Sequence, residues 1–131
     1  LTGGKLKKLL SSNEKLLMDG CHSTASAKNL YNYLKTIKEP IYGVWGMQKN
    51  KLPNKFIKSF NKIFKKLITV TIPNEPSALK ADELKKIGKK YVSTSAANNI
   101  QTALRQISSK ENKTIVIFGS LYLVGEILSK N

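Results

Sequence analysis

Acidic residues, arginine, histidine and cysteine are all scarce in this sequence. Cys21 is the only cysteine among the 131 residues, so an intrachain disulfide is excluded, and a single thiol is typical of a reducing compartment. The sequence has no apolar run long enough to cross a bilayer and no stretch that resembles a signal peptide. We therefore expect a cytoplasmic protein that has no membrane partner.

The shortage of acidic residues leaves a large positive charge. Asp and Glu total 8 against 23 Lys and Arg, which gives a formal net charge of +15. Such a balance of charge is typical of proteins that bind nucleic acid, acidic lipid or phosphorylated ligands. Arg105 is the only arginine, however, and base readout and bidentate phosphate binding both favour arginine. An A+T-rich genome also produces many lysines, so we expect diffuse charge and no nucleic-acid groove.

Several motifs of nucleotide and metal chemistry are missing. The sequence contains neither G-x-x-x-x-G-K-[ST] nor G-x-G-x-x-G, and the stretch Gly3-Gly4-Lys5 is too short to be either. One histidine, one cysteine and scattered carboxylates do not make a metal-ligand set, so we expect no metal bound by this chain. A Ser-His-Asp triad that used Ser120 would lack the nucleophile-elbow pattern.

What the sequence does contain is an alternation of apolar strands and amphipathic helices, repeated about five times. Strands are expected at 15–18, 41–45, 67–72, 91–92 and 114–118. Helices are expected from a cap at Ser23 or Thr24 to residue 39, over 53–66 and 82–88, from a cap at Ser95 to residue 107, and over 121–128. This order predicts one α/β domain over residues 1–131, with a mostly parallel sheet and helices on both faces.

Three turns, at 19–23, 46–51 and 119–122, directly follow predicted strands. The carboxyl ends of parallel strands meet at one edge of a sheet, where ligands bind, so we expect His22, Ser120 and Tyr122 to converge there. Asp19 suits either a hydrogen bond to a sugar hydroxyl or a cap of its own turn. His22, the only histidine, is either a catalytic group or a half-buried polar residue.

Five stretches carry a more specific pattern. They are 2–6 (TGGKL), 19–23 (DGCHS), 46–51 (GMQKNK), 76–84 (PSALKADEL) and 119–126 (GSLYLVGE). Together and in this order they resemble the C-terminal domain of folylpolyglutamate synthase / dihydrofolate synthase, a branch of the Mur ligase family. The resemblance covers nearly the whole chain and implies a Rossmann-like domain of the Mur ligase C-terminal type.

The resemblance also implies a role. In such an enzyme, this domain closes over a central ATPase domain, ATP phosphorylates the carboxylate of a folate or dihydropteroate, and the amine of glutamate attacks the acyl phosphate. The resemblance implies ATP contacts for Lys5 and Asp19, a catalytic position for His22, and glutamate contacts for Ser120 and Tyr122. ATP and Mg²⁺ would be bound only in the context of the complete enzyme.

Two departures and one gap count against activity. Lys5 and Ser23 stand where the family has arginine and asparagine, and the sequence has no central domain with its phosphate-binding loop and magnesium ligands. Phosphoryl transfer depends on positioning and on metal charge. We therefore expect a chain that is inactive alone, either a truncated gene product or one part of a split enzyme whose ATPase domain is a separate chain. The alternatives are a small basic nucleic-acid-binding protein and a non-catalytic interaction domain.

Overall fold

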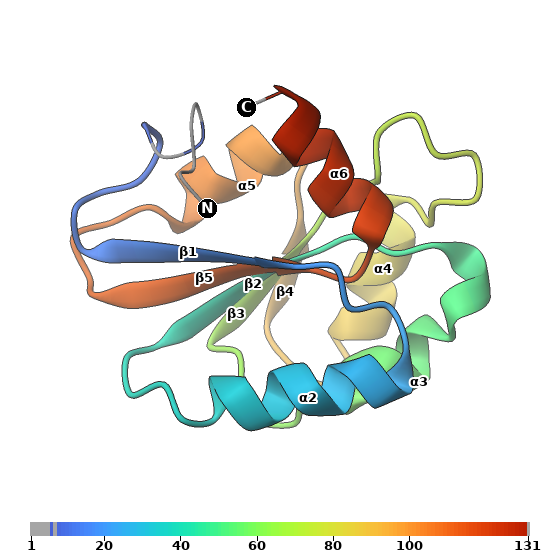
Figure 1. The fold of residues 1–131 in the computed structure, drawn as a ribbon, viewed down its shortest axis with the longest axis horizontal. Helices are drawn as coiled ribbons and strands as arrows, with labels where there is room; N and C mark the ends of the chain where they lie inside the picture. The colour runs from blue at the N-terminus through green and yellow to red at the C-terminus, as the bar shows by residue number, and fades with distance from the viewer. Residues whose placement is uncertain (1–5, 7, 131) are drawn as a thin grey trace.

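The computed structural model describes residue 6 and residues 8–130, which form one five-stranded, all-parallel sheet between two layers of helices (Figure 1). The sheet order is β1-β5-β2-β3-β4. The strands are β1 (Glu14–Asp19), β2 (Ile41–Trp45), β3 (Lys66–Thr69), β4 (Thr94–Ala96) and β5 (Lys113–Phe118). The helices are α2 (Thr24–Leu34), the 3₁₀ turn η1 (Lys49–Lys51), α3 (Pro53–Lys58), α4 (Ala81–Gly88), α5 (Ile100–Ile107) and α6 (Leu121–Lys130).

Both faces of the sheet are buried. Along β5, Ile115 and Ile117 pack into the apolar layer beneath α5 and α6, whereas Val116 and Phe118 pack into the layer beneath α2, α3 and α4. Figure 1 shows α5 and α6 above the sheet and α2 and α3 below it. A strand buried on both faces needs apolar residues at every position, which is why the central strands are recognisable in the sequence. The predicted α/β fold with helices on both faces is confirmed.

Two of the helices on the lower face, α2 and α3, are shorter than predicted. The helix expected over 53–66 ends at Lys58, and turns follow up to Lys62, whose φ of 61° is left-handed. The helix expected to reach residue 39 ends at Leu34, because the Thr36 hydroxyl bonds the Tyr33 carbonyl at 2.7 Å and competes with the helical pattern. The rings of Phe56, Phe60 and Phe64 still point inward, as predicted.

The predictions for the region around β4 were wrong. Tyr91 and Val92 do not form a strand, because both backbone N–H groups bond the Gly88 carbonyl in the turn that ends α4. Ser95 does not cap a helix but is the middle residue of β4. Asn99 caps α5 instead, and its side chain accepts the Thr102 N–H at 2.8 Å.

A buried ion pair joins the amino ends of β1 and β5. The side chains of Glu14 and Lys113 are both 0% exposed, and Lys113 Nζ lies 2.9 Å from Glu14 Oε2. Ser11 N, Ser108 Oγ and Ser109 N also donate to the Glu14 carboxylate. Burial opposes the ionisation of Glu14, but these hydrogen bonds outweigh burial and hold its pKa below the ordinary value.

Candidate functional site

The turns that follow β1, β2 and β5 meet at the carboxyl edge of the sheet. The strand register places Asp19 and Trp45 on either side of Phe118, so the three turns begin next to one another. Between them lies a cavity of about 460 Å³. The residues that line it are His22, Gln48, Asn50, Lys51, Leu121 and Tyr122. The turns meet at one edge as predicted and bring His22 and Tyr122 to one cavity, but Ser120, expected to converge with them, does not line it.

His22 is held by its own turn. The ring is half-buried, and Nδ1 lies 3.0 Å from the Gly20 carbonyl oxygen. Because a carbonyl only accepts, Nδ1 must be the donor in this contact, which leaves Nε2 as the ring nitrogen that can interact with a ligand. The backbone N–H of His22 donates to Ser26 Oγ at 3.2 Å. The arrangement fixes the ring so that Nε2 is the atom that can take a proton.

The start of α2 completes this turn. Ser23 Oγ accepts the Ser26 N–H at 3.1 Å, and Ser26 Oγ accepts the Ser23 N–H at 3.1 Å, so the two serines form a reciprocal capping box. Ser23 stands where the family pattern has asparagine, and both residue types are good N-caps. The substitution therefore keeps the geometry that presents His22.

Asp19 and Cys21 belong to the same turn as His22 but do not line the cavity. Asp19 Oδ1 accepts the Cys21 N–H at 2.8 Å, which is the turn-capping role, and the carboxylate also contacts the Cys21 thiol. Burial, with the neighbouring Asp19 carboxylate, raises the pKa of Cys21 to about 12. The thiol therefore stays protonated and is not a nucleophile.

Ser120 directly precedes α6 and Tyr122 lies in its first turn, but their side chains have different surroundings. Ser120 is 1% exposed, and its Oγ accepts the N–H groups of Tyr122 at 3.0 Å and Leu123 at 3.4 Å. Tyr122 is 60% exposed and lines the cavity. Gly119, with φ of 112°, makes the turn possible, because an added Cβ would lie 2.2 Å from the Gly46 carbonyl oxygen. The structure thus presents the Tyr122 hydroxyl and buries the Ser120 hydroxyl beneath it.

The cavity also has residues that were not predicted as site residues, on the turn after β2. Gln48, Asn50 and Lys51 form this wall, and the half-buried Lys51 supplies a positive charge. Gln48 Nε2 donates to Glu75 Oε2 at 3.2 Å and to Ser77 Oγ at 2.9 Å, which ties the turn to a loop far along the chain. The sequence indicated these three wall residues only through their position directly after the buried strand β2.

Three further observations bound the chemistry. Lys5, expected to contact ATP, lies outside the described residues. Within residues 6 and 8–130, no three His, Cys, Asp or Glu side chains are grouped so that they can hold a metal ion. Over the same part of the chain, no helix is both long enough and apolar enough to cross a membrane.

A known protein family matches nearly the whole chain. The sequence profile described as "Dihydrofolate synthetase, C-terminal domain" matches residues 4–130. No curated protein matches the sequence.

Solved structures match over nearly the whole chain. Escherichia coli FolC in complex with DHPP and ADP superposes with a TM-score of 0.78 at 14% identity, over 93% of this chain and 30% of that one. The bifunctional folylpolyglutamate synthase/dihydrofolate synthase from Yersinia pestis gives 0.77 at 20% identity, over 92% and 29%. A bifunctional synthase with Mn, AMPPNP and L-glutamate bound gives 0.78 at 20% identity, over 92% and 30%.

These likenesses define the fold. At such identities the superpositions show an all-parallel α/β domain of the Mur ligase C-terminal type. The chain spans less than a third of the length of each of these proteins.

Proposed function

Because this chain belongs to the dihydrofolate synthetase C-terminal domain family, we propose that it supplies the glutamate-binding half of an ATP-dependent folylpolyglutamate or dihydrofolate synthase. The observation that carries the proposal is the cavity that His22, Lys51 and Tyr122 line at the carboxyl edge of the sheet. Its volume of about 460 Å³ lies in the range of ligand pockets, roughly 300–1,000 Å³.

The cavity has the groups that an amino acid with two carboxylates requires. The Lys51 ammonium and the Tyr122 hydroxyl would bind glutamate carboxylates, and Ser120 would act by fixing the first turn of α6 beneath Tyr122. His22 Nε2 would orient the amine and receive a proton from it as the new C–N bond forms. The L-glutamate bound in one similar synthase supports this ligand.

ATP and Mg²⁺ would come with the rest of the enzyme. Of the residues expected to contact ATP, Asp19 caps its own turn through Oδ1, and its carboxylate would accept a hydrogen bond from a sugar hydroxyl. Among the described residues, no three His, Cys, Asp or Glu side chains are grouped so that they could hold Mg²⁺ by themselves. We propose that a central ATPase domain would hold Mg²⁺, which would supply positive charge next to the phosphates. The folate or dihydropteroate would also bind there.

Reconstitution tests this proposal. The chain alone, given Mg-ATP, glutamate and dihydropteroate, should release no ADP above a heat-killed control. With the central domain of a relative supplied as a separate chain, His22→Ala should lower glutamate-dependent ADP release by about a hundredfold or more, the usual weight of a general base. Tyr122→Phe should weaken glutamate binding, whereas Tyr33→Phe removes the same hydroxyl from an exposed residue of α2 and should change nothing.

A binding measurement keeps the test decisive if reconstitution fails. L-glutamate titrated into ¹⁵N-labelled chain should shift the amide signals of residues around the cavity, His22 and Tyr122 included. Unchanged activity in the reconstituted His22→Ala enzyme, or glutamate-induced shifts elsewhere, would contradict the assignment.

A further inference from the structure

The cavity lies next to a segment of the chain that is rich in lysine and has no acidic residue. Residues 40–74 contain no Asp or Glu and seven lysines: Lys49, Lys51, Lys55, Lys58, Lys62, Lys65 and Lys66. This segment includes β2, the turn that lines the cavity, and α3. Lys65 pairs with Glu111 and lies with Lys62 and Lys66 near the amino end of β3, so the lysines that precede them on η1 and α3 are the ones that can attract an extended anion near the cavity.

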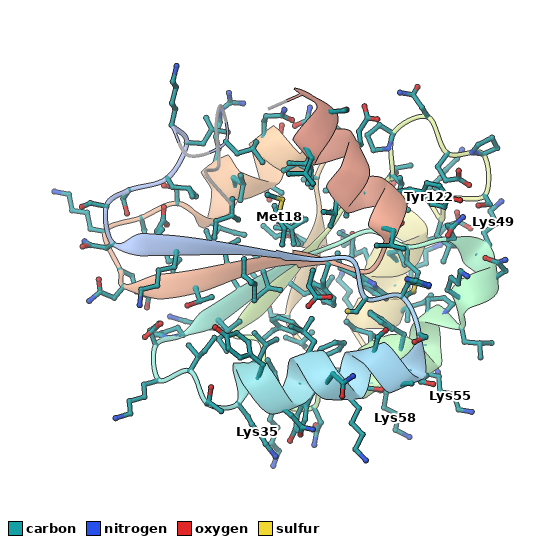
Figure 2. All side chains as sticks on the ribbon, in the orientation of Figure 1. Met18, Lys35, Lys49, Lys55, Lys58 and Tyr122 are labelled. Carbon is teal, nitrogen blue, oxygen red and sulfur yellow. The ribbon has the colours of Figure 1, made fainter. Side chains whose placement is uncertain are left out.

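Four of these lysines form a row that leads away from the cavity. This lysine row consists of Lys49 and Lys51 on η1 and Lys55 and Lys58 on α3. Lys51 lines the cavity, the other three are exposed, and none has an ion-pair partner among the described residues. Figure 2 shows Lys49 near Tyr122, with Lys55 and Lys58 successively farther along the same side of the molecule.

The backbone fixes the direction of the row. Leu52, between η1 and α3, has φ of 53°, a left-handed conformation that is uncommon for leucine, and it is 62% exposed. Pro53 then starts α3 at the position where proline is favoured. Lys55 and Lys58 are three residues apart and therefore neighbours on one face of the helix. The strained junction joins the turn that carries Lys49 and Lys51, of which Lys51 lines the cavity, to the helix that carries the other two lysines.

The chemistry of the proposed product matches this row. When glutamate residues are joined in a chain, each residue before the last uses its amine and one carboxyl group and keeps one free carboxylate, and the last residue keeps two. A polyglutamate tail is thus a flexible anion with at least one charge per unit. We infer that the lysine row binds the growing polyglutamate tail of the folate, an inference that rests on the proposed function of the cavity.

Other exposed lysines lack this arrangement and provide a matched control. Lys86 and Lys89 lie on and just after α4 with the same three-residue spacing as Lys55 and Lys58, but the first turn of α4 carries Asp82 and Glu83. The two pairs allow the same loss of charge to be compared near the cavity and elsewhere.

The experiment titrates γ-linked glutamate monomer, trimer and pentamer into the ¹⁵N-labelled chain at low and physiological salt. Affinity should rise with oligomer length and fall with salt, and the shifted amides should extend along η1 and α3. The Lys55→Gln/Lys58→Gln double variant should bind the pentamer about five- to tenfold more weakly, as expected for two exposed charge contacts, and the monomer almost unchanged. The Lys86→Gln/Lys89→Gln variant should stay within about twofold of wild type for both ligands.

The outcomes separate this inference from the proposed function. If the monomer shifts the cavity amides but the pentamer binds no tighter, or if both lysine pairs lose affinity equally, the tail site is wrong while the glutamate site stands. If the monomer does not reach the cavity, the proposed function fails and the inference with it. Tighter binding of a thymidine pentanucleotide than of the glutamate pentamer would assign the row to nucleic acid instead.

Discussion

The buried pair of Glu14 and Lys113 allows a quantitative test of what holds the sheet together. Replacing Lys113 with methionine keeps most of the buried volume and removes the cation that contacts the Glu14 carboxylate in this buried pair, in which both side chains are 0% exposed. Removing one partner of a buried pair typically costs about 3–5 kcal/mol, because the other charge is left uncompensated. Since Ser11, Ser108 and Ser109 still donate to Glu14, we expect the low end, about 3 kcal/mol.

The loss of stability in Lys113→Met depends on pH, and the direction of the Glu14 pKa shift determines how. A carboxyl group whose pKa is lower in the folded than in the unfolded chain stabilises the fold above its unfolded value, here about 4.5, and loses this effect as the pH falls through the folded pKa. The difference between wild type and Lys113→Met should therefore be largest near neutral pH. It should shrink in acid, where Glu14 is protonated in both proteins.

Urea unfolding followed by circular dichroism measures this loss, and the thermal midpoint should fall by roughly 10 °C. Lys65→Met is the matched control, because Lys65 pairs with Glu111 at the same 2.9 Å distance but is 55% exposed. We expect the control to cost less than about 1 kcal/mol. Equal urea midpoints for wild type and Lys113→Met, or equal losses for the two variants, would refute the reasoning.

Three further outcomes follow from the local structure. Native Cys21 should not react with a maleimide near neutral pH, because burial and Asp19 raise its pKa to about 12; labelling as fast as in urea would contradict this. Gly119→Ala should lower the free energy of unfolding by more than about 3 kcal/mol, because φ is left-handed and the added Cβ would lie 2.2 Å from the Gly46 carbonyl oxygen. A thermal midpoint equal to that of wild type would show that the turn adapts. Single-stranded nucleic acid should bind more weakly than about 1 μM at physiological salt, because the phenylalanine rings near α3 are buried; tighter binding in an anisotropy assay would overturn the diffuse-charge view.

The sequence was informative where burial on both faces leaves no choice of residue. The stretches 41–45 and 114–118 are continuous apolar runs, and both are central strands of the sheet. β4 is an edge strand of three residues with the sequence Thr-Ser-Ala, and it pairs on one side only. Its small polar residues are as common in loops as in strands, so the pattern alone could not locate it.

The site was predictable to the level of turns but not of side chains. Strand ends indicated which turns meet, and His22 and Tyr122 both reach the cavity. Whether Ser120 faces the cavity or the backbone of α6 depends on the backbone at Gly119, which the residue types do not specify. The place of Gln48 depends on Glu75 and Ser77, more than two dozen residues away, and such contacts leave no local pattern.

The sheet order has a consequence for how this chain is synthesised. β5, the last strand to leave the ribosome, lies between β1 and β2, which share no hydrogen bonds with each other and both pair with β5. Until residues 113–118 emerge, only β2, β3 and β4 can associate, and β1 has no partner strand. Because the turns that carry His22 and Tyr122 follow β1 and β5, the cavity forms at the moment when the final strand inserts and not before.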